Sequence, residues 1–508
     1  MKIEIYHNDF ALKIYSFLER DDSFVLKIES GLIQGYYQNN TYHFLGIPYA
    51  EPPVSNLRWK APRPPQKWEG IYLANEFGPA CPQIGGASFN LRTEKQSEDC
   101  LYLNVWSTTI DETAEQPVMV WIHGGGNLGG AGSEDAFDGE KLAQNGVTVV
   151  TFNYRLGAFG YIADPNIGCN FAVLDQIAAL KWVANNIRKF GGNPDNVTIF
   201  GESAGAQAVR YLLSSENAKG LFHKAIIQSA GFEKYVFSEE PTYEKVAKQT
   251  SKMFEELGSH NLAELQSVST ERILDISTKY SGVRPPSGEV HTPANLVWNQ
   301  VPDGEIISKS HFPALSKDIP ILIGCVENEA RYFIKPNKTY PEEVLLNMVD
   351  TLASSKKELI LSYFKQHNYS NYEALDKVFT TVIWFEPCLA TIKRFEKLCE
   401  HIYYYHFARV SPKAKMNNEL AKHTSEIKYI FGNLTPEEDY DEIDKEISFK
   451  MQYAWSTFAK YGVPKNIDHS NWCHYDKSNP YYTLINNRIQ TKPLEINQLT
   501  GYIQEIRN

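Results

Sequence analysis

The sequence predicts an α/β protein in which helices flank a large, mostly parallel central sheet. Two observations carry this prediction. β-rich runs such as residues 147–152 alternate with helix-compatible stretches such as residues 173–187, a pattern that is typical of parallel sheets. In addition, the β-branched and aromatic run 197–200 passes through a tight, glycine-containing pentapeptide into a helical stretch that begins at Ala206.

The pentapeptide is Gly201-Glu202-Ser203-Ala204-Gly205 and has the G-x-S-x-G form of a nucleophile elbow. Its small flanking residues permit a strained turn that lifts the serine hydroxyl above the edge of the sheet. The pattern alone recurs by chance in long chains, so the strand before it and the helix after it give it its weight. We therefore expect an α/β-hydrolase fold with Ser203 as its nucleophile.

A second strand, residues 117–122, leads into the loop 123–126 with the sequence HGGG. A serine that attacks a carbonyl needs donors for the oxyanion that forms. Glycines present bare backbone N–H groups, and an HGGG-type loop upstream of the elbow is typical of this fold. We expect the N–H groups of Gly125, Gly126 and Ala204 to form the oxyanion hole. A merely flexible glycine turn is the alternative.

Along most of its length the chain resembles the type B carboxylesterase and cholinesterase (carboxylesterase-lipase) family of α/β-hydrolases. The resemblance rests on short motifs that occur in the order of the family. These motifs are FLGIPYA at 44–50 with Pro52, Pro53 and LRW at 57–59, SEDCLYLNV at 97–105, NYRLG at 153–157, LDQ at 174–176, GGNP at 191–194 and QSAG at 228–231. Such a series is highly specific. It implies a serine ester hydrolase with helical insertions that form a lid and gorge.

The resemblance also implies the catalytic acid. In the family this acid is a glutamate just after a strand, in a segment similar to D-E-G-x-x-F. Here residues 319–324 form the expected strand and residues 328–333 read NEARYF, which implies Glu329. Ala330 stands where glycine is usual, and Glu327 is an alternative acid.

The base is implied by residues 423–432, HTSEIKYIFG, which resemble the family segment H-x-x-E/D-x-x-Y/F-V/I-F-G. This match identifies His423. His401 and His406 flank a tyrosine-rich strand, which favours packing or surface positions for them. The resulting chain order of serine, acid and histidine is that of the α/β-hydrolases.

The implied chemistry is acyl transfer that requires no metal and no organic cofactor. His423 takes the proton of Ser203 during attack on an ester, and Glu329 stabilises the imidazolium. Water then releases the acid from the acyl-enzyme. The resemblance further implies a supporting polar shell, which consists of Glu202, Ser229 and Glu426.

We expect residues 1–508 to form a single domain, because the catalytic segments are spread along the chain and have to converge. Within it we expect an N-terminal extension at 1–22. A polar, mostly helical insertion at 232–318 is expected to form part of the lid or gorge. The hydrophobic content of 43% is ample for one large core.

Charge and hydropathy exclude several classes of partner. The formal net charge of −11, from 50 basic and 61 acidic residues, provides no basic patch for nucleic acid. No uninterrupted apolar run is long enough to span a bilayer, so we expect no stable membrane anchor. The expected partner is a small-molecule ester, and the sequence leaves the oligomeric state open.

The N-terminus and the cysteines give opposing indications of location. Residues 1–10 carry acidic and polar groups where a signal peptide needs an apolar core, which favours the cytoplasm. The resemblance, however, implies that Cys81 and Cys100 match a disulfide of secreted relatives, and disulfides are rare in reducing compartments. The remaining cysteines show no metal-ligand spacing and are expected to be buried small hydrophobes. They are Cys169, Cys325, Cys388, Cys399 and Cys473.

The substrate class is predicted from a feature of the cholinesterases that this chain lacks. In them, a tryptophan in the loop between the matching cysteines binds a quaternary ammonium group, whereas residues 82–99 contain Phe89 and no tryptophan. We therefore expect small to medium uncharged carboxylic esters. A lipase or sterol-ester hydrolase of the same family is the alternative, and a non-catalytic, neuroligin-like binding protein is disfavoured because the triad is intact. Asn127 stands where an aromatic or other bulky residue is common, and the sequence leaves its role open.

Overall fold

The structure is a computed structural model that describes residues 24–84, 90–236, 242–282, 296–309, 311–335 and 339–508. The expected extension at 1–22 and the polar segment 1–10 lie outside the described residues. Phe89 and parts of the expected insertion lie outside them as well.

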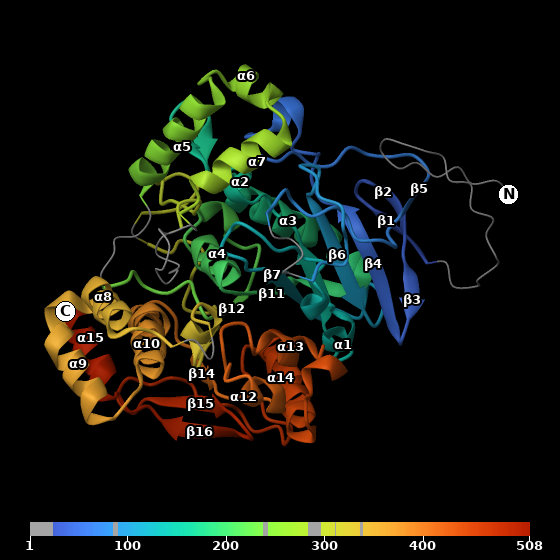
Figure 1. Cartoon of the computed structure of the whole chain (residues 1–508). Coiled ribbons are helices and arrows are strands. Elements are labelled where there is room, and N and C mark those ends of the chain that lie inside the picture. The colour runs from blue at the N-terminus through green and yellow to red at the C-terminus, as the bar shows by residue number, and fades with distance from the viewer. Residues whose placement is uncertain (1–23, 85–89, 237–241, 283–295, 310, 336–338) are drawn as a thin grey trace.

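An eleven-stranded sheet runs through the described part of the chain (Figure 1). The strands from β8 to β15 pair in parallel, whereas antiparallel pairs occupy both edges. The large, mostly parallel sheet that the sequence predicted is therefore present. In sheet order its strands are β16 (Ile489–Pro493), β15 (Tyr481–Ile485), β14 (Ile402–Phe407), β13 (Ile321–Val326), β12 (Lys224–Gln228), β11 (Gly192–Glu202), β7 (Gln116–Ile122), β8 (Thr148–Phe152), β6 (Tyr102–Ser107), β4 (Thr41–Pro48) and β3 (Tyr36–Gln38).

Two smaller sheets and a set of helices surround this sheet. The small sheets consist of β1 (Val25–Ile28), β2 (Gly31–Gln34) and β5 (Ile71–Leu73), and of β9 (Ala163–Asp164) and β10 (Gly168–Cys169). The helices of the first half are α1 (Glu140–Ala143), α2 (Gly157–Tyr161), α3 (Phe171–Asn186), α4 (Ala204–Leu213), α5 (Tyr243–Leu257), α6 (Leu262–Ser267) and α7 (Thr270–Lys279). Those of the second half are α8 (Glu342–Ala353), α9 (Lys357–Gln366), α10 (Asn371–Thr380), α11 (Glu386–Phe395), α12 (Pro412–Met416), α13 (Ile427–Phe431), α14 (Glu442–Tyr461) and α15 (Gln498–Arg507).

Strand β7 illustrates why the central strands read as continuous apolar runs. Its residues Val118, Val120 and Ile122 belong to one buried cluster, whereas Met119 and Trp121 belong to a second cluster. Successive side chains of a strand point to opposite faces of the sheet. A strand that is covered on both faces therefore has to be apolar at every position.

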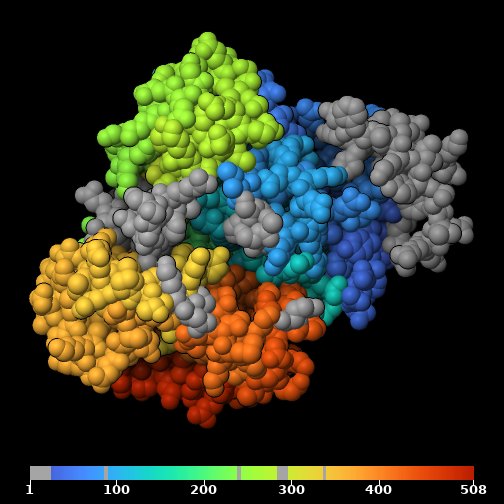
Figure 2. Space-filling view, viewed as in Figure 1, coloured from blue at the N-terminus to red at the C-terminus, as the bar shows by residue number. Residues whose placement is uncertain are grey.

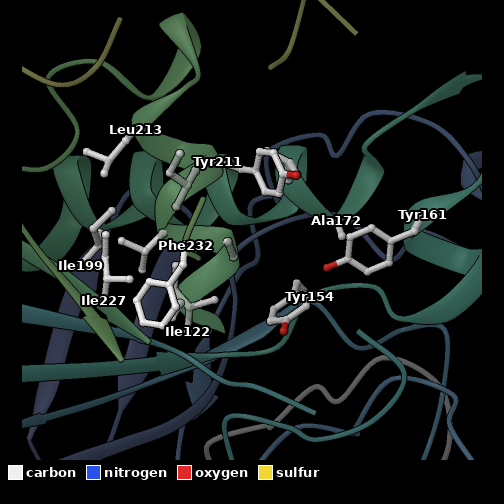
Figure 3. Packing of buried hydrophobic residues seen from close by; sticks show 14 of the residues in the cluster. Ile122, Tyr154, Tyr161, Ala172, Ile199, Tyr211, Leu213, Ile227 and Phe232 are labelled. Carbon is white, nitrogen blue, oxygen red and sulfur yellow. The ribbon is translucent and has the colours of Figure 1, made fainter. Parts of the chain in front are cut away.

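The larger cluster fills the face of the sheet that α4 covers. Figure 3 shows Ile122, Ile199 and Ile227 from the neighbouring strands β7, β11 and β12, with Leu213 of α4 and Phe232 beside them. Burial of each such side chain contributes about 1.5–3 kcal/mol. The sheet is consequently a firm platform for the loops at its edge.

The parallel strands bring remote segments of the chain to one edge. The HGGG loop follows β7, Ser203 follows β11 and Glu329 follows β13. Because these strands are parallel, their carboxyl ends lie at the same edge of the sheet, where α/β proteins place their ligands. The topology thus predicts a site at this edge.

The helices α5, α6 and α7 lie together at one end of the molecule (Figures 1 and 2). They form the helical part of the expected insertion, whose bounds at 232–318 and single-domain context stay predictions. Within the described residues, no helix combines the length and apolar character needed to cross a bilayer.

Candidate active site

Ser203 lies in the turn between β11 and α4 with a backbone φ of +54° and ψ of −128°. This left-handed φ is uncommon for serine, and its main-chain N–H donates to the carbonyl of Gln228 at 2.9 Å, which fixes the turn. Only glycine fits at position 205, because a Cβ there would lie 1.9 Å from the carbonyl oxygen of Ile122. The glycine pattern found in the sequence is therefore a packing requirement of a tight elbow.

The glycine loop after β7 lies against this elbow. A Cβ on Gly124 would come within 3.1 Å of the Cβ of Ser203. Gly125 and Gly126 have φ values of +99° and +62°, which glycine adopts without steric cost. Among the described residues, no acceptor takes a hydrogen bond from the N–H groups of Gly125, Gly126 or Ala204. These donors are available to a developing oxyanion.

His423 and Glu329 form a buried pair, and His423 lines the same cavity as Ser203. His423 Nδ1 donates to Glu329 Oε2 at 2.5 Å, and the side chains are 3% and 0% exposed. Glu329 Oε1 accepts a hydrogen bond from the N–H of Val326 at 3.0 Å, which ties the carboxylate to the end of β13. Such a carboxylate fixes both the tautomer and the orientation of the imidazole.

A short backbone bridge brings the acid and the base together. Asn328, which precedes Glu329, forms an isolated parallel bridge with Lys422, which precedes His423. The N–H of Asn328 donates to the carbonyl of Ala421 at 2.9 Å. The two loops therefore run side by side with the acid and base in adjacent positions.

Glu327, the alternative acid, pairs with a different histidine. Its Oε2 accepts a hydrogen bond from His406 Nε2 at 2.5 Å. His406 is buried on β14 and does not line the cavity at Ser203. The structure thus places Glu329, and not Glu327, beside His423. His401 is exposed, and His123 is buried in the glycine loop with its ring stacked on Tyr154.

The second nitrogen of His423 faces Glu202, the residue before the serine. His423 Nε2 lies 3.1 Å from Glu202 Oε1, without hydrogen-bond geometry. Burial raises the pKa of Glu202 well above its ordinary value, and the neighbouring carboxyls of Glu329 and Glu134 raise it further. Burial beside other carboxyls thus favours the neutral form of Glu202 over its charged form.

The other two predicted supporting residues occupy different positions. Glu426 is 0% exposed and accepts a hydrogen bond from Gln228 Nε2 at 3.3 Å. Burial, followed by Glu202 and Glu329, raises its pKa to about 8. Ser229 lies at the end of β12, where its buried Oγ has no partner among the described residues. Its assignment to the supporting shell stays a prediction.

Several residues at the site were not identified from the sequence. The rings of Tyr332, Phe333 and Trp384 lie 5.8, 5.5 and 5.6 Å from that of His423. Trp384 belongs to a π-helical turn, Thr381–Phe385, and such turns occur often at functional sites. An aromatic residue in a helical run looks like core in a sequence, so no signal distinguished Trp384. Glu134 also lines the cavity, and burial raises its pKa to about 8.

A large cavity opens in front of these groups. Its volume is about 1320 Å³, and its lining includes Ser203, His423, Gly125 and Gly126. Leu296 and Leu274 contribute apolar surface to it. A cavity of this size accepts a substrate considerably larger than an acetate ester. Within the described residues, no group of His, Cys, Asp and Glu side chains could hold a metal ion.

The cysteines agree with the sequence predictions except at one position. Cys81 and Cys100 form a disulfide with a Cα–Cα distance of 5.1 Å. Cys169, Cys325, Cys388 and Cys399 are free and buried. Cys473, however, is only half-buried, because it lies in the segment between α14 and β15 and outside the main core. The prediction that it is buried was wrong.

Comparisons with known proteins find relatives over nearly the whole chain. The sequence model of the carboxylesterase family matches residues 22–500. The para-nitrobenzyl esterase of Bacillus subtilis (strain 168) is 34% identical over 472 residues, which cover 89% of this chain and 92% of the relative. The fumonisin B1 esterase of Sphingopyxis macrogoltabida is 32% identical over 482 residues, with coverages of 90% and 85%. A solved structure of PNB esterase is similar with a TM-score of 0.80 at 32% identity, and covers 94% of this chain and 99% of its own.

Proposed function

The chain belongs to the carboxylesterase family, and we propose that it hydrolyses carboxylic esters through an acyl-enzyme on Ser203. The family resemblance and the α/β-hydrolase fold predicted from the sequence are both confirmed. The protein is accordingly a carboxylic ester hydrolase. One observation supports the residue assignment above all others. The buried contact of 2.5 Å between His423 and Glu329 lies in the same site as the strained Ser203 elbow.

Acylation begins when His423 takes the hydroxyl proton of Ser203 and Oγ attacks the ester carbonyl. The imidazolium that forms is stabilised by the Glu329 carboxylate. His423 then delivers the proton to the alkoxide leaving group, so that the alcohol departs and the acyl group remains on Ser203. Water, deprotonated by the same histidine, attacks the acyl-enzyme and releases the carboxylic acid.

The glycine loop stabilises the negative charge of both tetrahedral intermediates. The N–H groups of Gly125, Gly126 and Ala204 have no other acceptor in the described structure, and Gly125 and Gly126 line the same cavity as Ser203. Loss of one such donor typically lowers turnover about 10²- to 10³-fold.

The substrates that the site supports are small to medium uncharged esters. No tryptophan is present between Cys81 and Cys100 to bind a quaternary ammonium group, which disfavours choline esters. The names of the two relatives, para-nitrobenzyl esterase and fumonisin B1 esterase, are compatible with an esterase of broad alcohol range. A lipase of the same family uses identical chemistry. A series of esters of increasing acyl length, with and without a lipid interface, separates the two activities.

Labelling with a fluorophosphonate and assay with p-nitrophenyl acetate and butyrate test the proposal directly. We expect stoichiometric labelling of Ser203 in the wild type, with loss of label and turnover in Ser203→Ala. Ser215→Ala is a matched control, since Ser215 is a buried serine beyond the opposite end of α4. It is expected to retain label and activity. A folded wild type without label or turnover would contradict the assignment and favour a neuroligin-like binding protein.

The cytoplasmic location stays a prediction, as do the single-domain organisation and the nature of the partners. The disulfide between Cys81 and Cys100 counts against the cytoplasm, because such bonds persist mainly in oxidising compartments. Mass spectrometry of the protein, alkylated without reduction in its native compartment, decides between the two. Alkylated Cys81 and Cys100 would support the cytoplasm.

A further inference from the structure

Asn127, the residue after the three glycines, is wholly buried and binds a segment remote in the sequence. Its Nδ2 donates to the carbonyl of Trp298 at 3.3 Å and to Asn299 Oδ1 at 3.2 Å. Gln300 Oε1 lies at the limit of hydrogen bonding, at 3.5 Å. All three neighbours are acceptors, so the amino group of the carboxamide has to face them. Asn127 therefore connects the glycine loop to residues 298–300.

The main chain of Asn127 is fixed as well. Its carbonyl accepts a hydrogen bond from the N–H of Gly157 at 2.7 Å, and its φ is +61°. The carbonyl of Gly125 accepts from Leu128 and Gly129, both at 3.1 Å. The two bonds to Gly125 close the loop into a turn, and the bond from Gly157 ties Asn127 to the start of α2. The side-chain contact to 298–300 holds the outer end of the loop.

The segment that Asn127 binds is itself anchored. Trp298 Nε1 donates to the carbonyl of Ser277 on α7 at 2.9 Å. Asn170 holds the next residue, since its Nδ2 donates to the carbonyl of Val301 at 2.8 Å and its Oδ1 accepts from the N–H of Val301 at 3.0 Å. The segment is thus a fixed support between α7 and α3.

We propose that Asn127 is a positioning residue for the oxyanion hole. Its carboxamide clamps the glycine loop to residues 298–300 and so keeps the N–H groups of Gly125 and Gly126 aimed at the reacting oxygen. Oxyanion donors act only when they are held in advance where the charge develops. Loss of the clamp is expected to weaken binding of the tetrahedral state more than binding of the ester. This inference rests on the proposed function and adds a residue to it.

Asn127→Gly and Asn170→Gly form a matched pair that tests the proposal. Both asparagines are buried, both have a left-handed φ, of +61° and +57°, and both hold the segment 298–301. Glycine retains this φ, so each variant loses only its side chain. Only Asn127 adjoins the oxyanion glycines.

For Asn127→Gly we expect kcat on p-nitrophenyl butyrate to fall about 10- to 100-fold with KM within threefold, as for a partly misplaced donor. The inhibition constant of a trifluoromethyl ketone, which forms a tetrahedral adduct on serine, should rise by the same factor. Asn170→Gly should lower the Tm to a similar extent, but kcat should fall less than in Asn127→Gly, because Trp298 Nε1 still anchors the segment to the carbonyl of Ser277. Equal kcat for the two variants, or a change in KM alone, would overturn the proposal.

Asn299→Ala removes the acceptor without altering the glycine loop, and it serves where Asn127→Gly does not fold. It should lower kcat about 3- to 10-fold, because the Trp298 carbonyl remains as a partner. Unchanged kcat in this variant would also count against the clamp. Labelling of Ser203 in the wild type distinguishes failure of the proposed function from failure of the clamp. If Ser203 in the wild type is not labelled, the proposed function fails. If Ser203 is labelled and the Asn127→Gly variant is fully active, only the clamp is refuted.

Discussion

Two histidine–glutamate pairs lie near one another in this molecule, yet only one of them is buried at the cavity. His423 contacts Glu329 at 2.5 Å, and His406 contacts Glu327 at the same distance. The two glutamates are two residues apart at the end of β13. The pairs differ in what surrounds the remaining ring nitrogen. For His423 it is Glu202 and the cavity, and for His406 it is the sulfur of Cys325 at 3.8 Å.

This difference between the two pairs shows that contact with a carboxylate is not sufficient for a histidine to act as a base. Burial by itself lowers the pKa of His406, but the contacts to Cys325 and Glu327 outweigh this and raise the pKa to about 10. The ring is therefore already protonated at neutral pH and cannot accept a proton from a nucleophile. The His406 pair is a half-exposed ion pair, whereas the His423 pair leaves one nitrogen available at the cavity.

The strongest test of this comparison replaces each glutamate by glutamine. Glu329→Gln should lower kcat/KM about 10³- to 10⁴-fold, because the amide no longer holds the correct tautomer or stabilises the imidazolium. Glu327→Gln should leave kcat/KM within threefold. Steady-state hydrolysis of p-nitrophenyl butyrate measures both. Comparable losses in the two variants would show that the His406 pair takes part in catalysis.

A smaller effect, on stability, is expected at Glu426, a buried carboxyl that interacts with His423 and Glu329. Its pKa of about 8 lies above the ordinary value near 4.5, so the folded state binds a proton that the unfolded state releases. The contribution of Glu426 to wild-type stability therefore declines as the pH rises from about 4.5 to about 8. Glu426→Gln removes this decline and should be more stable than the wild type at pH 8.5 by a few kcal/mol, at most about 5 kcal/mol.

The two proteins should differ least at pH 4.5, where Glu426 is protonated in the folded state and about half protonated in the unfolded state. Urea titrations followed by tryptophan fluorescence at pH 4.5, 6.5 and 8.5 measure the difference. If the gap stayed constant over this range, Glu426 would be ionised in the folded protein at neutral pH.

The smallest effect concerns the stability that the His406 pair provides. Because the folded pKa of His406 is raised, this contribution is complete below about pH 6.5 and disappears as the pH rises through about 10. Glu327→Gln should lower the free energy of unfolding by about 1 kcal/mol at pH 6.5, a modest value since Glu327 is 50% exposed and screened by water. The deficit should vanish near pH 10.5 in the same urea assay. A deficit that persists there would assign it to packing.

The parts of the site that could be predicted from the sequence are those encoded locally. The elbow at Ser203 and the glycine loop are each a strand followed by a turn of small residues. Their conformation is therefore predicted by neighbouring residues in the sequence alone. The choice between Glu329 and Glu327 depended on a backbone bridge between Asn328 and Lys422, which only the fold creates. The family resemblance indicated the correct neighbour for His423 before that bridge was visible.

Other features depended on partners far away in the chain. The role of Asn127 was left open because its acceptors at 298–300 come from the end of the insertion. Trp384 was missed because a π-helical turn has the same apolar pattern as an ordinary buried helix. The sheet, by contrast, was predicted well. Fully apolar strands that alternate with helices can be recognised from the residue types and their periodicity, without knowledge of distant contacts.

The parallel arrangement of β7, β11, β13 and β14 also has a consequence for how the protein acquires activity. Parallel neighbours can pair only after a long crossover has closed, and such non-local contacts form slowly. Ser203, Glu329 and His423 meet only when several of these crossovers are complete. During refolding, helical signal should therefore return before turnover. The first molecule to cleave an ester is one in which the strands from β7 to β14 have already paired.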